Sequence, residues 1–424
     1  MRNGLLSIAG ALAWALAPAA CSSSSTSVPD SGAPDSMPDT TVDSTLDSSL
    51  DATADATDAE VAADTSSGDV ATDTSLSDVA TDTSPGDVAT DTSPADVVTD
   101  SGGLSDARLV EIVVGGDPQF IVAGDNDDLW FTECQGNKIG RLTTSGALTE
   151  YTVPTAASCP WEIAKSALAT GTGGAVEAFF FTERGGNKIG AVTATGDFVE
   201  FPIPTAGTCP SGLTTWPTDG RLWFTENCDV GWAAPDRIGS LDPYATPNIV
   251  EIPTQVGGAS LTGIAAGSDG YVWYAVRAPS QGQIGRYKPS GGGSMCVVPE
   301  WESEPMEITA GPDGRMWFTE YAGNAIGVVD PAKFNCFPSP FTEFPLSASG
   351  SHPVGIAVGP PCDGTGRAVW FAEEHGAKLG CVTTAGNIHE YPVSSSAWGI
   401  TEGPDGNLWF TEPAAHVVGR LLAP

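Results

Sequence analysis

The sequence predicts an all-β protein, a seven-bladed β-propeller closed by an outer strand from the N-terminal end of the repeat region. An aromatic tetrad recurs seven times after residue 109, at intervals of 39 to 53 residues. Each repeat divides into four short strand-like pieces, and one further piece precedes the first repeat but is missing from the last. Repeats of this length that consist of short strands are typical of propeller blades.

The tetrad consists of two aromatic residues that are followed, in most repeats, by Thr-Glu. Its seven copies begin at Trp130, Phe180, Trp223, Trp273, Trp317, Trp370 and Trp409. Six copies end in glutamate. A residue repeated in nearly every blade is expected to support the fold through cross-strand pairing rather than to catalyse a reaction.

The other pieces of a repeat surround the tetrad in a fixed order. A short first piece such as Gly399–Thr401 leads to a tight turn, Gly403-Pro-Asp-Gly406, whose last glycine can adopt the positive φ of a hairpin. The tetrad strand follows, then a piece such as Asn137-Lys-Ile-Gly140, then an outer strand such as Leu148–Val153. Alternating apolar and polar residues place one face of each strand between neighbouring blades.

The two ends of the repeat region complement each other. It begins with a lone outer strand, Leu109–Val114, and ends with Val417–Leu422, after which no outer strand follows. The first piece can complete the last blade, which closes the ring and removes exposed strand edges. We therefore expect the propeller to span residues 109–424.

Residues 1–20 have the pattern of a secretion signal, with Arg2 at the start and an apolar stretch from Leu5 to Ala17. Small residues before Cys21 and serines after it resemble a bacterial lipoprotein signal. This resemblance implies that Cys21 carries a lipid anchor, whereas ordinary cleavage would leave its thiol free. Because Ser22 is not the aspartate that retains lipoproteins at the inner membrane, we expect an exported cell-envelope protein, anchored in the outer membrane and facing the outside.

Residues 21–108 lead from this cysteine to the propeller and are expected to form a disordered acidic linker. After Cys21 they are almost wholly Ser, Thr, Asp, Ala, Pro and Val, and a nine-residue unit recurs from Asp69, Asp78 and Asp87. A segment without aromatic residues buries too little apolar surface to offset the entropy of ordering.

Charge excludes two classes of partner. The formal net charge is −36, of which residues 22–108 contribute −18 from 19 acids and Arg108, and residues 109–424 contribute −19 from 34 acids and 15 bases. Without a basic stripe the protein cannot neutralise phosphates, which argues against nucleic acid. Electrostatic docking on anionic lipid is excluded likewise, so we expect membrane contact only through the lipid anchor. Nothing in the repeats indicates an oligomer, and we expect a monomer.

Eight cysteines remain after Cys21, an even number for an exported protein. Pairing of sequence neighbours keeps every bridge within one blade or between adjacent blades. It predicts the disulfides Cys134–Cys159, Cys209–Cys228, Cys296–Cys336 and Cys362–Cys381. A zinc site is the alternative, but no Cys-x-x-Cys occurs.

The repeat resembles that of the virginiamycin B lyase (streptogramin lyase) family. The similarity lies in Leu129-Trp-Phe-Thr-Glu133, in Asn187-Lys-Ile-Gly190 and in the outer strand Phe198–Pro204, and it covers nearly all of residues 109–424. It implies a seven-bladed propeller that uses Mg²⁺ and a histidine base. Members of that family linearise cyclic depsipeptide antibiotics of the streptogramin B type by elimination at an ester, as carbon-oxygen lyases, and consume no water.

The family's catalytic residues do not carry over to this chain. Its histidines follow a proline at the start of the innermost strand of late blades. The corresponding positions of the seven repeats hold Gln119, Trp161, Ser211, Thr262, Met306, Val354 and Trp398. Where the family has two glutamates, the chain has Pro413 and Ser396. We therefore expect the lyase machinery to be absent from its usual place.

A displaced catalytic site is one hypothesis. Glu374 and His375 directly follow the sixth tetrad, and His352 lies at the start of the same repeat. A histidine base beside a carboxylate that holds Mg²⁺ suits an elimination, with Glu374 as the metal ligand. The alternative is that His375 belongs to a hairpin turn and His352 to a surface loop.

A binding site on the axis is the other hypothesis. Trp161, Trp398, Met306 and Gln119 occupy positions that surround the axis in such a propeller. Aromatic and polarizable side chains suit stacking against an extracellular small molecule, a glycan or a peptide. The alternative is that these side chains only plug the channel. Because no axial position holds histidine, the sequence favours a binding propeller over a divergent lyase.

Overall fold

The computed structural model describes residues 109–169, 174–227, 236–244, 249–254, 259–278 and 281–422. The secretion signal, the lipid anchor at Cys21 and the acidic linker therefore remain predictions, since they lie outside the described residues. Within the described ranges no helix combines the length and the apolar composition needed to cross a membrane.

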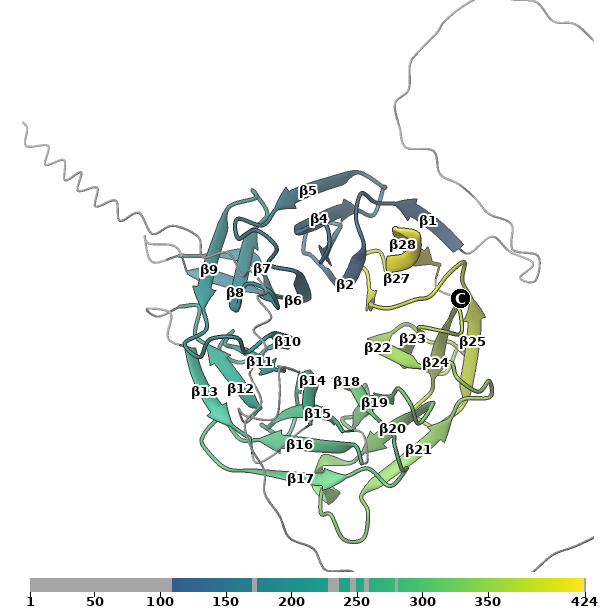
Figure 1. Cartoon of the computed structure of the whole chain (residues 1–424). Helices are drawn as coiled ribbons and strands as arrows, with labels where there is room; N and C mark the ends of the chain where they lie inside the picture. The colour runs from purple at the N-terminus through teal and green to yellow at the C-terminus, as the bar shows by residue number, and fades with distance from the viewer. Residues whose placement is uncertain are drawn as a thin grey trace, which may run out of the picture. The chain divides into compact units, whose positions relative to one another are not determined.

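Seven four-stranded antiparallel sheets surround one axis, which confirms the predicted propeller (Figure 1). The first strand of each blade lies innermost, and the innermost strands of successive blades contact one another. Blades 1 and 2 contain β2 (Pro118–Ala123), β3 (Asp128–Glu133), β4 (Lys138–Thr143), β5 (Leu148–Thr152), β6 (Pro160–Ala169), β7 (Ala175–Glu183), β8 (Lys188–Thr193) and β9 (Phe198–Pro202). Blades 3 and 4 contain β10 (Pro210–Thr215), β11 (Leu222–Glu226), β12 (Arg237–Leu241), β13 (Ile249–Pro253), β14 (Ser260–Ala266), β15 (Val272–Arg277), β16 (Gln283–Tyr287) and β17 (Gly293–Val297).

The remaining strands form blades 5 to 7. Blades 5 and 6 contain β18 (Pro305–Ala310), β19 (Met316–Glu320), β20 (Ala325–Val329), β21 (Phe341–Pro345), β22 (Pro353–Gly359), β23 (Ala368–Glu373), β24 (Lys378–Val382) and β25 (Ile388–Pro392). Blade 7 contains β26 (Ile400–Glu402), β27 (Leu408–Glu412), β28 (Val417–Leu421) and β1 (Leu109–Val113). Two single-turn 3-10 helices are also described, η1 (Pro331–Lys333) and η2 (Pro413–Ala415).

The ring closes as predicted, through the first strand of the described chain. β1 pairs antiparallel with β28, with Leu109 opposite Leu421 and Val113 opposite Val417. The buried Ile112 packs in a cluster with Phe131 of blade 1. The closing strand therefore completes blade 7 and also contributes to the interface between blades 7 and 1.

A glycine in the third strand of each blade makes room for an aromatic ring of the tetrad. The ring atoms lie 2.0 to 2.3 Å from the place where a β-carbon on that glycine would stand. The seven pairs are Phe131–Gly140, Phe181–Gly190, Phe224–Gly239, Tyr274–Gly285, Phe318–Gly327, Phe371–Gly380 and Phe410–Gly419. Because interiors are close-packed, any side chain at this position would displace the ring, so the repeated glycine is a packing requirement.

The tetrad threonine joins each blade to the next. In blade 1 the Thr132 hydroxyl accepts a hydrogen bond from the Phe120 N–H (3.2 Å) and donates one to the Trp161 carbonyl of blade 2 (2.5 Å). Four further threonines make the same two bonds: Thr182, Thr225, Thr319 and Thr411. Together with Thr132, all five are fully buried. Thr411 bonds the Gln119 carbonyl and so links the last blade to the first.

Two blades replace this threonine with alanine and are joined differently. In blade 4, which has Ala275, the Thr262 hydroxyl donates to the Pro305 carbonyl of blade 5 (3.0 Å). In blade 6, which has Ala372, the Gly355 N–H donates directly to the Trp398 carbonyl of blade 7 (3.1 Å). A hydrogen bond to the next blade is therefore present even in the two blades that lack the tetrad threonine.

One face of each blade also carries a row of three side chains, one from each outer strand. In blade 1 Glu133 and Lys138 are cross-strand partners, and Lys138 Nζ lies 2.6 Å from Glu150 Oε2. The corresponding lysines of blades 2 and 6 form the same pair, Lys188–Glu200 and Lys378–Glu390. The tetrad glutamates are fully buried. The six repeated glutamates thus belong to cross-strand charge rows, in line with a structural role.

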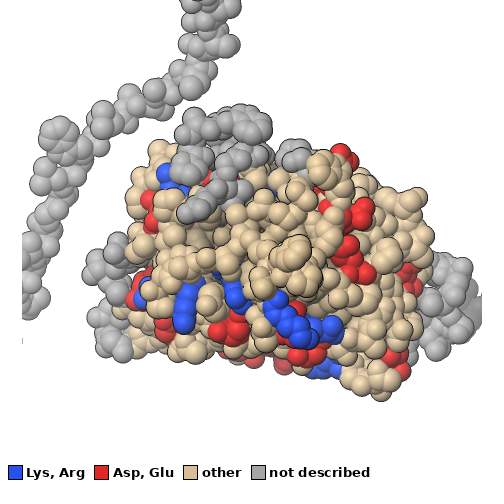
Figure 2. Space-filling view, turned by 90° about the horizontal axis from the view of Figure 1, so that it is seen from below, with Lys and Arg blue, Asp and Glu red and all other residues tan. Residues whose placement is uncertain are grey.

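Charged side chains elsewhere on the propeller are also interspersed. Figure 2 shows the rim on the side of β17, where basic side chains lie beside acidic ones among a larger area of uncharged residues. Arg286 with Asp269 (3.3 Å) and Arg315 with Asp313 (2.6 Å) are ion pairs of blades 4 and 5.

Three of the predicted disulfides are confirmed: Cys134–Cys159, Cys296–Cys336 and Cys362–Cys381. Each lies within one blade or between adjacent blades. Cys209 forms no disulfide with any described cysteine, and its predicted partner Cys228 lies outside the described residues. That fourth bridge stays a prediction.

Replacing Thr411 with valine removes the hydroxyl that joins blade 7 to blade 1. The Gly399 N–H and the Gln119 carbonyl then stay buried without a partner, so we expect T411V to lower the free energy of unfolding by about 1–3 kcal/mol in urea denaturation. T411S keeps the hydroxyl and is the control, with a smaller loss. A T411V protein as stable as the wild type would contradict the bridging role.

Buried tetrad glutamates make stability depend on pH. Burial, with the charge of an outer-strand glutamate, raises the pKa of Glu133 and Glu183 to about 7 and that of Glu226 to about 8, from an ordinary value of 4.5. Since these groups ionise more readily in the unfolded chain, stability is lost as the pH rises through this window. We expect the thermal midpoint, measured by circular dichroism, to fall between about pH 5.5 and about pH 8.5.

The control for this pH dependence is the E133Q variant, in which one of the titrating groups is absent. Its thermal midpoint should fall less steeply over the same interval. A wild-type midpoint that rises from the lower to the higher pH would show that these glutamates are not held protonated in the folded protein.

Candidate functional site

The upper face of the propeller is the face on which the innermost strands begin and on which the hairpins between second and third strands turn. Seven positions surround the axis there, and we call them the axial ring: Gln119, Trp161, Ser211, Thr262, Met306, Val354 and Trp398. Trp161, Met306 and Trp398 keep partial exposure, whereas the other four residues are buried. Three of the four predicted ligand-binding residues are therefore the accessible members of the ring.

Two of these residues lie against each other. Trp161 of blade 2 and Trp398 of blade 7 meet edge to face, with their ring centres 5.8 Å apart. Phe120 packs edge-on against Trp161 at 5.9 Å, and the Arg184 guanidinium lies 4.6 Å from the Trp161 ring centre. The Trp398 indole nitrogen is buried and has no hydrogen-bond partner. The contact spans blades 7 to 2 and forms an aromatic surface beside the axis.

The other two predicted residues are placed differently. Gln119 lies between the tryptophans in blade order, but its side-chain amide donates to the Asp117 carbonyl (3.2 Å) and carboxylate (3.1 Å), and the residue is buried. Met306 begins blade 5, three blades from Trp161. The structure thus joins Trp161 and Trp398, and it places Met306 on a different part of the ring.

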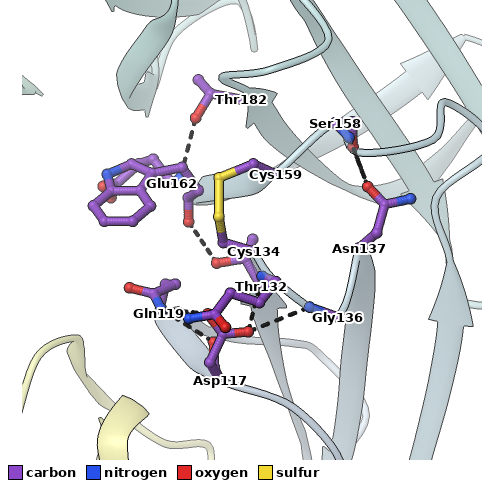
Figure 3. The surroundings of a disulfide bond; sticks show 12 residues. Asp117, Gln119, Thr132, Cys134, Gly136, Asn137, Ser158, Cys159, Glu162 and Thr182 are labelled. Carbon is purple, nitrogen blue, oxygen red and sulfur yellow. Dashed lines mark hydrogen bonds between the residues drawn. A yellow bond between two sulfur atoms is a disulfide. The ribbon is translucent and has the colours of Figure 1, made fainter.

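A disulfide and a hydroxyl hold the backbone around Trp161. Figure 3 shows the disulfide, Cys134–Cys159, with Thr132 beside it. The Cys134–Cys159 bridge ties the β3–β4 hairpin of blade 1 to the chain two residues before Trp161. The Thr132 hydroxyl of blade 1 binds the Trp161 carbonyl. A side chain on a backbone fixed in this way loses little further freedom on binding a ligand, which favours affinity.

Two axial glutamates were missed by the sequence analysis. Glu162 and Glu307 directly follow members of the axial ring in blades 2 and 5, and because these blades are not neighbours, the interaction between their charges crosses the axis. Burial and the charge of Glu307 raise the pKa of Glu162 well above its usual range, and burial raises that of Glu307 to about 8. The pair therefore retains a proton near neutral pH.

The sequence contains a signal for this pair, although a weak one. In four of the other blades the same position holds a glycine: Gly212, Gly263, Gly355 and Gly399. A β-carbon on Gly212 or Gly355 would stand 2.3 Å from a carbonyl oxygen of the next blade. Blade 1 has Phe120 at this position, and blades 2 and 5 are the two that have a glutamate in place of the glycine.

The three predicted catalytic residues come together at the edge of the upper face. His352 precedes β22, and Glu374 and His375 lie in the β23–β24 hairpin. The two imidazole rings are nearly perpendicular, with centres 4.6 Å apart. The Glu374 N–H donates to the His352 carbonyl (3.1 Å). His375 therefore lies in a hairpin and the partly buried His352 in the loop before β22, and these positions bring the two rings together.

Neighbouring blades add residues that the sequence analysis did not single out. The Tyr321 ring lies 4.4 Å from the His352 ring, and burial together with a hydrogen bond to Glu374 raises the pKa of the Tyr321 hydroxyl to about 12. Arg277 lies over Tyr321 at 5.5 Å and pairs with Glu304 at 2.7 Å. Like Glu374 and Arg184, Tyr321 and Arg277 directly follow a tetrad, so this position was the available signal.

The magnesium ion implied by the family resemblance does not fit these residues. Mg²⁺ requires a set of oxygen ligands in near-octahedral geometry. Around Glu374 the described groups are one tyrosine hydroxyl and two imidazoles. Among all described residues, no three His, Cys, Asp or Glu side chains converge in a way that could hold a metal ion.

Comparison with known proteins places the chain beside enzymes of this architecture. Residues 104–364 match the model of the virginiamycin B lyase family. A virginiamycin B lyase from Nocardia farcinica is 30% identical over 122 residues, which span 28% of this chain and 38% of that relative. The chain thus aligns with well under two thirds of that relative's length.

Solved structures extend the similarity over the whole propeller. A streptogramin B lyase structure is 29% identical with a TM-score of 0.62, and covers 74% of this chain and 96% of its own. The virginiamycin B lyase of Staphylococcus aureus is 28% identical with a TM-score of 0.63, and covers 74% and 99%. A catalytically inactive histidine-to-alanine variant of that enzyme has been crystallised with quinupristin.

Proposed function

The chain belongs to the virginiamycin B lyase family, and from that premise we propose that it is a binding propeller rather than a lyase. In this proposal it is exported, anchored to the envelope through Cys21, and binds an extracellular small molecule, glycan or peptide on its axial ring. The observation that carries the proposal is the Trp161–Trp398 contact at the axis, in a ring where none of the seven positions holds histidine.

The chemistry of the ring supports this assignment. Indole rings offer apolar area and a π face at a low entropic cost, and they suit the stacking of a sugar or an apolar peptide. Both Trp161 and Trp398 keep partial exposure, so their rings are accessible to a ligand. Gln119, in contrast, is occupied by Asp117 and contributes through position rather than through its amide.

Quinupristin, which the related enzyme binds, is the probe for this site. We expect the full chain to bind quinupristin without converting it, and W161A to weaken binding at least tenfold, because a lost aromatic contact of about 1.4 kcal/mol changes affinity by that factor. Isothermal titration calorimetry measures both. W301A, which removes an exposed tryptophan outside the ring, is the matched control and should bind as the wild type does.

Equal affinity of the wild type, W161A and W398A would contradict binding at the axial ring. Absence of any quinupristin binding would remove cyclic depsipeptides from the ligand class. Sugars and linear peptides would then be the remaining candidates.

A divergent lyase that linearises cyclic depsipeptides of the streptogramin B type is the second candidate, and one observation favours it. Glu374, His375 and His352 lie together with Tyr321, so a base and a polar partner are close enough to act on one substrate. The missing metal ligands stand against it. We rank it second for that reason.

Liquid chromatography with tandem mass spectrometry distinguishes the two functions, because a linear isomer differs from the cyclic depsipeptide in retention and in fragments. A lyase gives a linear product of unchanged mass from quinupristin, because the elimination consumes no water. With Mg²⁺ present we expect no such product from the wild type. A linear product that disappears in H375A but persists in H389A, which changes a histidine of β25, would establish the second candidate and contradict the first.

A further inference from the structure

The charge row of blade 5 differs from those of the other six blades. Blades 1, 2, 3 and 6 each hold a tetrad glutamate, an outer-strand glutamate and a basic residue between them. The three rows besides that of blade 1 are Glu183–Lys188–Glu200, Glu226–Arg237–Glu251 and Glu373–Lys378–Glu390. In these blades two carboxylates are accompanied by one cation.

Blades 4 and 7 have no basic residue in the row, and each compensates for its absence in a different way. In blade 4 all three positions are uncharged, with Val276, Gln283 and Met295. Blade 7 keeps both glutamates, Glu412 and Glu111, and has Val417 at the cation position. Its Glu412 accepts hydrogen bonds from the Ser394 hydroxyl (2.9 Å) and the Ser395 N–H (2.8 Å). The charges are removed in the first case, and the tetrad carboxylate is satisfied by donors in the second.

Blade 5 keeps both glutamates, but it has neither the uncharged row of blade 4 nor the hydrogen-bond donors of blade 7. Its row is Glu320, Ala325 and Glu343, so alanine stands where four blades have lysine or arginine. Glu320 is 0% exposed, and neither of its carboxylate oxygens has a hydrogen-bond partner among the residues that the structure describes. Among the described blades it is the tetrad glutamate with neither a neighbouring base nor a bonded donor.

The two carboxylates of blade 5 face the same space above β20. Glu320 Oε1 lies 2.7 Å from the place of a β-carbon on Gly327, and Gly327 is the cross-strand partner of Glu343. Ala325, two residues earlier on β20, is on the same face. The Glu300 N–H donates to Glu343 Oε1 (3.3 Å), and the charge of the exposed Glu300 acts on both other glutamates.

The titration of these groups reflects the missing cation. Burial, with the charges of Glu343 and Glu300, raises the pKa of Glu320 to about 9. The pKa of Glu343 is raised mainly by burial, whereas in blade 2 hydrogen bonds to Lys188 and Thr155 outweigh burial and lower that of Glu200. A proton therefore compensates in part for the cation that the other blades supply.

We propose that blade 5 binds a primary ammonium group between Glu320 and Glu343, in the place that a lysine side chain occupies in blades 1, 2 and 6. A lysine ammonium donates three hydrogen bonds and carries one positive charge. It therefore matches two carboxylates that have no basic residue between them. Glu343 is partly exposed and Glu300 is exposed, so the site opens at the rim of the blade. This site is independent of the axial ring and of the function proposed for it.

A primary ammonium fits better than a metal ion or water. No three carboxylates converge on one point among the described residues, as a Ca²⁺ or Mg²⁺ site would require. A water molecule can donate to the carboxylates but cannot neutralise them. A primary ammonium supplies both the charge and the N–H donors that the two carboxylates lack.

Thermal unfolding of the full chain at about pH 8.5 tests the proposal. Ethylammonium chloride should raise the thermal midpoint by about 2 °C more than the same concentration of tetramethylammonium chloride, which has the charge but no N–H donor. Calcium chloride at matched ionic strength forms the third arm. A larger shift with calcium than with ethylammonium would assign the site to a metal ion and overturn the proposal.

Variants locate the effect in blade 5. A325K supplies the cation from within, so the midpoint without added amine should rise by about 2 °C or more, and the extra shift with ethylammonium should disappear. E343Q removes one carboxylate and should reduce the ethylammonium shift to the tetramethylammonium value, which keeps the test decisive if A325K does not fold.

The matched control creates the same vacancy in another blade. K138A removes the lysine between Glu133 and Glu150, and it should gain an ethylammonium-dependent rise in the midpoint larger than that of the wild type. Equal shifts with ethylammonium and tetramethylammonium in the wild type would overturn the proposal. An ethylammonium shift that stays unchanged in E343Q would do the same.

Discussion

The propeller depends on one interaction, the bond between a tetrad hydroxyl and the backbone of the next blade. Inner strands such as β2 leave the regular ladder between Pro118 and Ile121, where the register shifts. The released N–H of Phe120 and the Trp161 carbonyl of the next blade both bind the buried Thr132 hydroxyl. Because unpaired backbone groups in a buried position are costly, this hydroxyl fixes where each blade meets its neighbour.

The same bond explains why the axial ring is able to carry function. The hydroxyls hold the backbone carbonyls of the ring residues, while the side chains at these positions take no part in the bond. Residues as different as Trp161, Val354 and Gln119 therefore occupy equivalent positions without changing how the blades join. A family fold can lose the histidines of one reaction in this way and keep its architecture, since function resides in the side chains of the site.

The formal net charge of the propeller differs from its actual charge because several of its acidic residues are buried. The formal −19 of the propeller counts every acid as ionised, but the raised pKa values of Glu133, Glu226 and the Glu162–Glu307 pair mean that several of them retain protons near neutral pH. The tetrad acids are buried within blades, so they present no charge to a partner. The formal charge of the propeller therefore overstates the charge that its surface presents.

Sequence reasoning succeeded where the signal was local or periodic. Tetrads, turns, the closing strand and three disulfides follow from spacing along the chain, and His352 met His375 because both positions are fixed by the repeat. It failed where side chains of different blades meet: the Glu162–Glu307 interaction crosses the axis, and Tyr321 of blade 5 reaches Glu374 of blade 6. Such contacts depend on the diameter of the ring and on which side chains are large enough to reach across it. The repeat pattern predicts neither of these.

The central claim is that the axial ring binds a ligand and leaves it intact. A crystal structure of the full chain with quinupristin tests it most directly. The account predicts an unbroken depsipeptide ring in contact with the indoles of Trp161 and Trp398. A linearised product beside His352 and His375, or a ligand bound away from the axis, would contradict it.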